Sequence, residues 1–245
     1  MSAALLACAL LGGCVTPVAT NCPRCVVVDR AHPSVTGWRP RTRRLFVLIP
    51  GALGYGWEWN AAVDALRRRR DVDFLVFAWD PWQSFQRAAD ELTEVLAALL
   101  WDAPPSVREV VVVAHSAAGI FAAKALGRLR VPEGRHLRLA TIGAPFAGML
   151  GPPGSLDDPW HSPVLLGVMG TFRDYPHPPP RTDVVEYVTS YPEDPVMQPR
   201  YGHVVAPAEI GPPGRSRISM RHADHNQVVA RVVERLLADD PKEPR

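Results

Sequence analysis

The sequence lacks the features that mark nucleic-acid-binding and fibrous proteins. Its 27 basic and 25 acidic residues leave a formal net charge of only +2, which is too weak to indicate a nucleic-acid partner. Lysine is almost absent, since only Lys124 and Lys242 occur and arginine carries nearly all the positive charge. A composition of 47% hydrophobic and 21% charged residues, without internal repeats, excludes collagen, coiled coil and wholesale disorder. The length of 245 residues suits one large α/β domain.

The first 13 residues carry no charge and are nearly all Ala, Leu and Gly. The run is too short to span a bilayer, which takes roughly 20 apolar residues. It is typical of the apolar region of a secretory signal; a buried apolar helix is the alternative. Residues 11–14 resemble the lipobox of bacterial lipoproteins, which implies cleavage before Cys14 and acylation of its thiol. We therefore expect a signal peptide over residues 1–13 and a protein anchored by lipidated Cys14 to a bacterial membrane, on its periplasmic face or at the cell surface.

The other cysteines are few. Cys8 would leave with the signal peptide, and Cys22 and Cys25 lie in the expected tether, residues 14–43. In an oxidising compartment this pair can form a small disulfide, or it remains as two free thiols. No further ligands follow at zinc spacing, and the proline-rich surroundings do not provide the βαβ setting of a thioredoxin-like motif.

Strands and helices alternate from residue 44 to residue 238. Short apolar runs predict buried strands over 44–49, 73–79, 109–114, 137–142, 184–190 and 217–220, and an edge strand over 25–29. Helical spacing lies over 57–70, 84–101, 117–129 and 225–238. This order is typical of a parallel sheet with helices on both faces. We expect one domain over 44–238 and a tail over 239–245.

A proline-rich segment, residues 147–182, interrupts this alternation. The chain has 26 prolines, about twice the usual share, and eight of them lie in this segment. A loop of this length inside a compact domain is usually functional or disordered. Because it lies between two predicted strands, we expect it to form a lid over the carboxyl ends of the strands.

Ser116 carries the main chemical signal. It follows a valine-rich strand directly, a helix follows it, and small residues stand two positions away on each side, Ala114 and Ala118. A sharp strand-to-helix turn exposes such a serine above the sheet edge, where the first N–H groups of the helix favour developing negative charge. The alternative is an ordinary helix with a serine N-cap.

Residues 110–119 resemble the nucleophile elbow of α/β-hydrolases, and specifically of bacterial lipases and esterases with this fold. The family pattern is Gly-x-Ser-x-Gly; here alanines stand at both glycine positions, and Gly119 follows directly. The resemblance covers residues 44–238. It implies an α/β-hydrolase fold, with a mostly parallel sheet, helices on both faces and a short Pro-rich lid. It implies neither a cofactor nor a metal.

In this family an acid and then a histidine follow the nucleophile along the chain. Asp194, after the strand predicted at 184–190, is the expected acid, with Glu193 as the competitor. His225, at the start of the last predicted helix, is the expected base, and His222 is the alternative. The acid would hold the histidine while the histidine takes the serine proton.

The resemblance also places an oxyanion hole after the first central strand. Residues 49–54 stand where the family has His-Gly-x, with Pro50 in place of the histidine. The expected donors are the backbone N–H groups of Ala52 and Ala117, with Leu53 as the substitute for Ala52.

Four residues are candidates for the substrate pocket. Residues 139–148 resemble a strand-end stretch of lipases, which assigns Pro145 and Phe146 to the pocket wall. Most tryptophans are expected in the core, but Trp57 and Trp82 lie in predicted turns near the reactive edge. Together these residues predict a serine hydrolase that cleaves a carboxylic ester of a small molecule or lipid through an acyl-enzyme. A thioesterase or amidase with the same triad, and a non-catalytic binding lipoprotein, are the alternatives.

Overall fold

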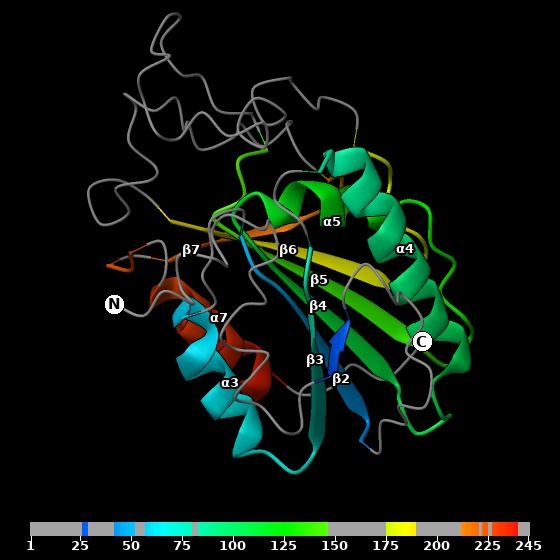
Figure 1. Ribbon diagram of the computed structural model, residues 1–245, viewed down its shortest axis with the longest axis horizontal. Coiled ribbons are helices and arrows are strands. Elements are labelled where there is room, and N and C mark those ends of the chain that lie inside the picture. The colour runs from blue at the N-terminus through cyan, green and yellow to red at the C-terminus, as the bar shows by residue number, and fades with distance from the viewer. Residues whose placement is uncertain are drawn as a thin grey trace, which may run out of the picture.

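A seven-stranded sheet forms the centre of the computed structural model, which describes residues 26–28, 42–51, 57–79, 83–146, 175–189, 212–220, 222–224 and 227–239. The strand order is β1-β3-β2-β4-β5-β6-β7, and all neighbours are parallel (Figure 1). The strands are β1 (Val26–Val28), β2 (Arg44–Ile49), β3 (Val72–Phe77), β4 (Glu109–His115), β5 (His136–Ile142), β6 (Thr182–Val188) and β7 (Ser216–Ser219).

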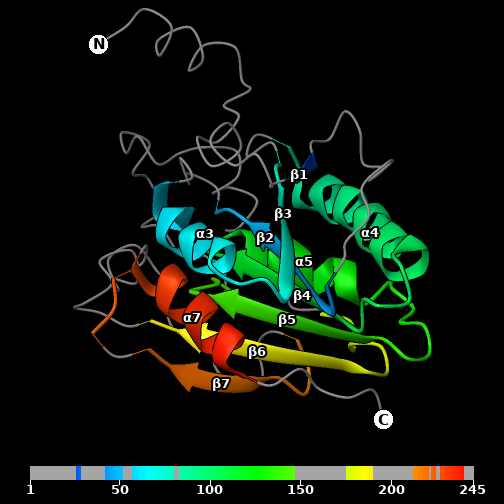
Figure 2. The same cartoon turned by 90° about the horizontal axis from the view of Figure 1, so that it is seen from below.

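Helices cover both faces of the sheet (Figures 1 and 2). The helices α4 (Phe85–Asp102) and α5 (Ala118–Leu126) lie on one face, and α3 (Asn60–Arg67) and α7 (Gln227–Ala238) lie on the other. Strand β4 is a continuous apolar run because both of its faces are buried: Val110 and Val112 pack toward α4 and α5, and Val111 and Val113 toward α3 and α7. The predicted architecture, a parallel sheet with helices on both faces, is confirmed.

The predicted strands and helices are all present; β2 has its predicted bounds, and the ends of the other elements are shifted. The helical spacing over 57–70 corresponds to a 3-10 turn, η1 (Trp57–Trp59), followed by α3, which ends at Arg67. The next arginines are exposed, and they form the turn into β3. β6 begins at Thr182, two residues before the predicted start. Among the described residues, no helix has the length and apolar character needed to cross a membrane.

The end of the proline-rich segment is partly described. Tyr175 is buried, and its ring packs edge-on against Phe146 with 5.2 Å between centroids. Pro176 lies against Gly127 at the end of α5, where an added Cβ would overlap its ring. Residues 147–174, the greater part of the expected lid, lie outside the described residues.

A buried ionic cluster lies where the strands begin. Glu109 accepts from Arg44 at 2.9 Å and pairs with Arg138 at 3.3 Å, and all three side chains are nearly inaccessible. Arg44 also donates to the carbonyl of Leu236 at 2.7 Å, and Arg138 pairs with Asp239 at 3.0 Å. The cluster therefore fastens the end of α7 to the amino ends of β2, β4 and β5.

The strand order reverses between β2 and β4. From β2 the chain moves outward to β3, then returns to the other side of β2 as β4 and continues to β5, β6 and β7 (Figure 1). Ligands of open parallel sheets bind outside the carboxyl ends of the strands at such a reversal. The residues that follow the two central strands here, around Gly51 and Ser116, therefore define the candidate site.

Candidate active site

Ser116 forms a strained turn at the carboxyl end of β4. Its φ is +54°, in the left-handed region that a residue with a side chain seldom adopts. Such a conformation costs roughly 1–2 kcal/mol, so neighbouring contacts must hold it. The Ser116 N–H donates to the carbonyl of Ile142 at 2.7 Å, which ties the turn to the end of β5. The side chain is partly exposed, although the residues on both sides of it are buried.

The glycine that close packing requires lies three positions after the serine. A Cβ at Gly119 would lie 2.5 Å from Ala144 Cβ and 3.3 Å from Thr141 Cβ, so the first turn of α5 can meet the end of β5 only without a side chain here. Ala118 is also completely buried, and the packing accommodates its methyl group. The alanine at the second glycine position of the family pattern thus fits this elbow, because Gly119 provides the close contact.

The turn after β2 approaches the serine closely. A Cβ at Gly51 would lie 3.0 Å from Ser116 Cβ and 3.3 Å from His115 Nδ1. Only glycine therefore lets this backbone lie beside the nucleophile without displacing it. Ala117 is the N-cap of α5 and has helical backbone angles. Its N–H therefore lies at the start of the helix, where the N–H groups have no intrahelical acceptor. Ala52 and Leu53, the other expected donors, lie outside the described residues.

Two tryptophans pack on opposite faces of the sheet, Trp79 at this turn and Trp59 at the end of β4. The Trp79 indole N–H donates to the Pro50 carbonyl at 2.7 Å, and its ring packs edge-on against Phe121 of α5 with 4.7 Å between centroids. On the other face, Trp59 packs edge-on against His115 at 6.5 Å, and both rings are buried. None of these contacts was predicted from the sequence. Strand alternation alone could have indicated the face on which His115 lies, since it places His115 on the opposite face from Ala114.

The expected acid and base, Asp194 and His225, and the competitor Glu193 lie outside the described residues. His222, the alternative base, is exposed, has a φ of +55°, and its carbonyl accepts from Arg231 at 3.1 Å. The Asp224 carboxylate accepts from the N–H of Gln227 at 2.7 Å, which caps the start of α7.

Pro145 and Phe146 are buried after the end of β5. Phe146 is 1% exposed, between Tyr175 and Arg215, whose guanidinium lies 5.7 Å from its ring centroid. Arg215 pairs with Glu186 at 2.6 Å, and burial raises the pKa of the Tyr175 phenol. Phe146 thus packs against the carboxyl ends of the strands on the face covered by α4 and α5. The side chain of Trp57 and all of Trp82 lie outside the described set.

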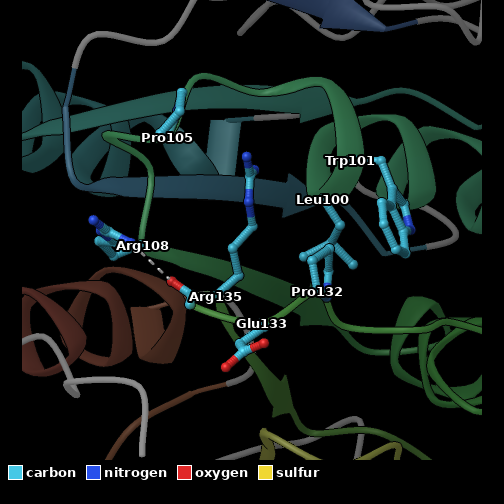
Figure 3. Close-up of a pocket in the computed structure, with 8 residues that line it drawn as sticks. Leu100, Trp101, Pro105, Arg108, Pro132, Glu133 and Arg135 are labelled. Carbon is cyan, nitrogen blue, oxygen red and sulfur yellow. Dashed lines mark hydrogen bonds between the residues drawn. The ribbon is translucent and has the colours of Figure 1, made fainter.

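A surface hollow of about 220 Å³ lies at the opposite end of the central strands, where they begin (Figure 3). It is formed by the end of α4 and the segments that enter β4 and β5; the lining includes Trp101, which is 60% exposed, Arg108 and Arg135. Arg135 donates to the carbonyls of Leu99 and Ala103, and burial followed by the nearby Arg108 lowers its pKa. Because the strands begin at this end, the hollow is remote from Ser116 and is not its substrate pocket.

Comparison with known proteins gives the fold a name. No family model matches the sequence, and no curated protein matches it. Among solved structures, RedJ with a PEG molecule in its active site is 16% identical, covers 89% of this chain and 98% of its own, and has a TM-score of 0.50. A protein of Agrobacterium vitis S4 described as a hydrolase is 13% identical, with coverages of 81% and 90% and a TM-score of 0.52. Together with the sheet order and the helices on both faces, these similarities show that the chain has an α/β-hydrolase fold.

Proposed function

We propose that this protein is a serine hydrolase that cleaves carboxylic esters through an acyl-enzyme on Ser116. The observation that supports this most is the strained turn itself: a serine with a φ of +54° stands at the reversal of the strand order, with the backbone of Gly51 packed against it. A serine that only capped the helix would typically have an extended backbone, not a left-handed one. Strain of this kind recurs at functional sites, where the surrounding structure maintains it.

In the proposed reaction His225, oriented by Asp194, removes the Ser116 proton as the oxygen attacks the ester carbonyl. The N–H groups of Ala117 and Ala52 stabilise the oxyanion, each by about 3 kcal/mol. Protonated His225 then gives its proton to the departing alcohol. Water, activated by the same histidine, hydrolyses the acyl-serine and frees the acid.

The first experiment is labelling with a fluorophosphonate, which reacts with an activated serine. We expect the parent protein to be labelled and Ser116→Ala to remain unlabelled. Ser219→Ala, which removes an exposed serine from β7, is the control and should be labelled like the parent. Absence of labelling in folded parent protein would contradict the proposal and favour a binding protein on a hydrolase scaffold.

The leaving group is tested separately. We expect p-nitrophenyl esters to be hydrolysed, with a dependence on acyl-chain length, faster than the matched thioesters and anilides. If the thioester or the anilide has the higher kcat/KM, the protein is instead a thioesterase or an amidase with the same nucleophile.

We also propose that the mature protein is anchored to a bacterial membrane through acylated Cys14. The support is the uncharged run before this residue and its resemblance to a lipobox. In a bacterial host, the protein should be found in the membrane fraction, with an acylated Cys14 detected by mass spectrometry. The Cys14→Ser variant should lose both properties; membrane association of that variant, without acyl mass, would contradict this assignment.

A further inference from the structure

We propose that Trp79 is a positioning residue that holds the turn after β2 against the nucleophile elbow. This inference rests on the proposed function, because the turn leads from Pro50 and Gly51 into the segment that carries the proposed oxyanion donor. Trp79 itself does not touch the substrate in this proposal. It acts through the Pro50 carbonyl, 29 residues away in the sequence.

The contacts of Trp79 join the two halves of the site. Its N–H donates to the Pro50 carbonyl at 2.7 Å, a short bond from a partly buried ring to a buried residue. Its ring packs edge-on against Phe121, 4.7 Å away, and lies 6.1 Å from Phe85. Phe121 belongs to α5, the helix that begins directly after Ser116. One rigid side chain therefore connects the turn after β2 with the helix after β4.

The close approach of Gly51 to Ser116 makes the position of this turn important for the nucleophile. A methyl group there would lie 3.0 Å from Ser116 Cβ, so the backbone of the turn lies close beside the serine. Proline has no N–H, so its carbonyl is the one backbone hydrogen-bonding group through which this residue can be held. Because the peptide bond is planar, fixing the Pro50 carbonyl also fixes the direction of the Gly51 N–H. Loss of the indole donor would free this peptide plane at the point where the chain enters the proposed oxyanion segment.

A displacement of oxyanion donors affects the transition state more than the substrate, because the donors are placed for the charge that develops during attack. We therefore expect Trp79→Phe, which keeps a ring beside Phe121 but removes the N–H, to slow fluorophosphonate labelling about tenfold. With an ester substrate the loss should fall on kcat and leave KM within about twofold.

The matched control is Phe85→Leu. Phe85 belongs to the same aromatic cluster, 6.1 Å from Trp79, but makes no bond to Pro50. Its substitution loosens the ring packing while leaving the indole donor in place. We expect a urea midpoint at least as low as that of Trp79→Phe, with a labelling rate equal to that of the parent.

The outcomes separate the inference from the proposed function. If the parent is labelled and Trp79→Phe is labelled equally fast, the inference is overturned and the serine hydrolase stands. If only Phe85→Leu is slowed, packing and not the hydrogen bond positions the turn, which also overturns it.

If the parent is not labelled, the proposed function fails, and hydrogen exchange decides the structural part. Amide exchange over residues 46–60 should then be faster in Trp79→Phe than in Phe85→Leu. Equal exchange in the two variants would show that the bond does not hold the turn.

Discussion

Two glycines let separate segments meet at Ser116, and one of them provides a test of the packing. Gly119→Ala would place a methyl group 2.5 Å from Ala144 Cβ. We expect this overlap to reduce the free energy of unfolding by about 1–3 kcal/mol and to slow labelling of Ser116. Ala118→Gly, which restores the family pattern one residue earlier, should cost at most about 1 kcal/mol and keep labelling. Urea unfolding measures both, and a Gly119→Ala protein as stable as the parent would contradict the packing argument.

The acid and the base are tested by paired substitutions of neighbouring residues. We expect Asp194→Asn and His225→Gln each to slow labelling roughly 10²-fold or more, because the serine would lose its activated base. Glu193→Gln and His222→Gln should retain the parental rate. If the effects are exchanged within either pair, the role belongs to the other member of that pair.

At the scale of elements, β6 and the segment that enters it each contain a buried tyrosine, Tyr187 and Tyr175, whose ionisation is suppressed. Burial raises the pKa of Tyr175 and of Tyr187 above the ordinary value of 10.0. The unfolded chain therefore loses these protons at a lower pH than the folded protein does. Stability from this source is complete below pH 10 and falls as pH rises further, by up to about 1.4 kcal/mol per pH unit for each group.

Tyr175→Phe should flatten this decline. The variant keeps the ring that packs on Phe146 and removes the ionisable hydroxyl. We expect the urea midpoints of parent and variant to be similar near pH 8 and to diverge near pH 11, with the variant the more stable. Parallel curves over this range would show that the Tyr175 phenol does not titrate differently on folding.

The elements themselves were predictable from the sequence where their pattern is local. The valine run of β4 and the serine with small neighbours lie within ten residues, so both the strand and the elbow could be inferred. The predicted end of α3 at residue 70 was wrong, because the helix ends at Arg67. Arg68–Arg70 continue the helical composition, and only the start of β3 at Val72 shows that a turn is needed there. The bond from Trp79 to Pro50 had no signal in the sequence, since it joins two loops that meet only after the sheet forms.

At the scale of the whole molecule, the cluster around Glu109 joins three strands to the last helix. Glu109→Gln would leave Arg44 and Arg138 buried without their shared carboxylate. Breaking a buried pair in this way typically costs about 3–5 kcal/mol. We expect a loss of this size in urea unfolding, whereas Asp71→Asn, at an exposed ion pair with Arg69, should leave the midpoint unchanged. A Glu109→Gln protein with the parental midpoint would show that the cluster adds nothing to stability.

The sheet topology was predictable as a class, because alternation of strands and helices restricts the chain to a doubly covered parallel sheet. The reversal of strand order between β2 and β4 was implied only by the resemblance of the elbow to a known family. The sequence order of Ser116, Asp194 and His225 predicted a triad, but of these three the described residues include Ser116 alone. The order of these residues along the chain predicts their catalytic roles. It does not predict how close their side chains lie, because that depends on loops that have no periodic sequence pattern.

The left-handed backbone of Ser116 has a consequence for how this chain can change over time. Glycine adopts that conformation without strain, so Ser116→Gly should be more stable than Ser116→Ala by about 1 kcal/mol. At this position the residue that best fits the backbone is therefore one that has no nucleophile. A single substitution, Ser116→Gly, would relieve the backbone strain and remove the nucleophile together, so stability and activity oppose each other at this turn. An unreactive descendant of this protein would be expected to carry glycine here first.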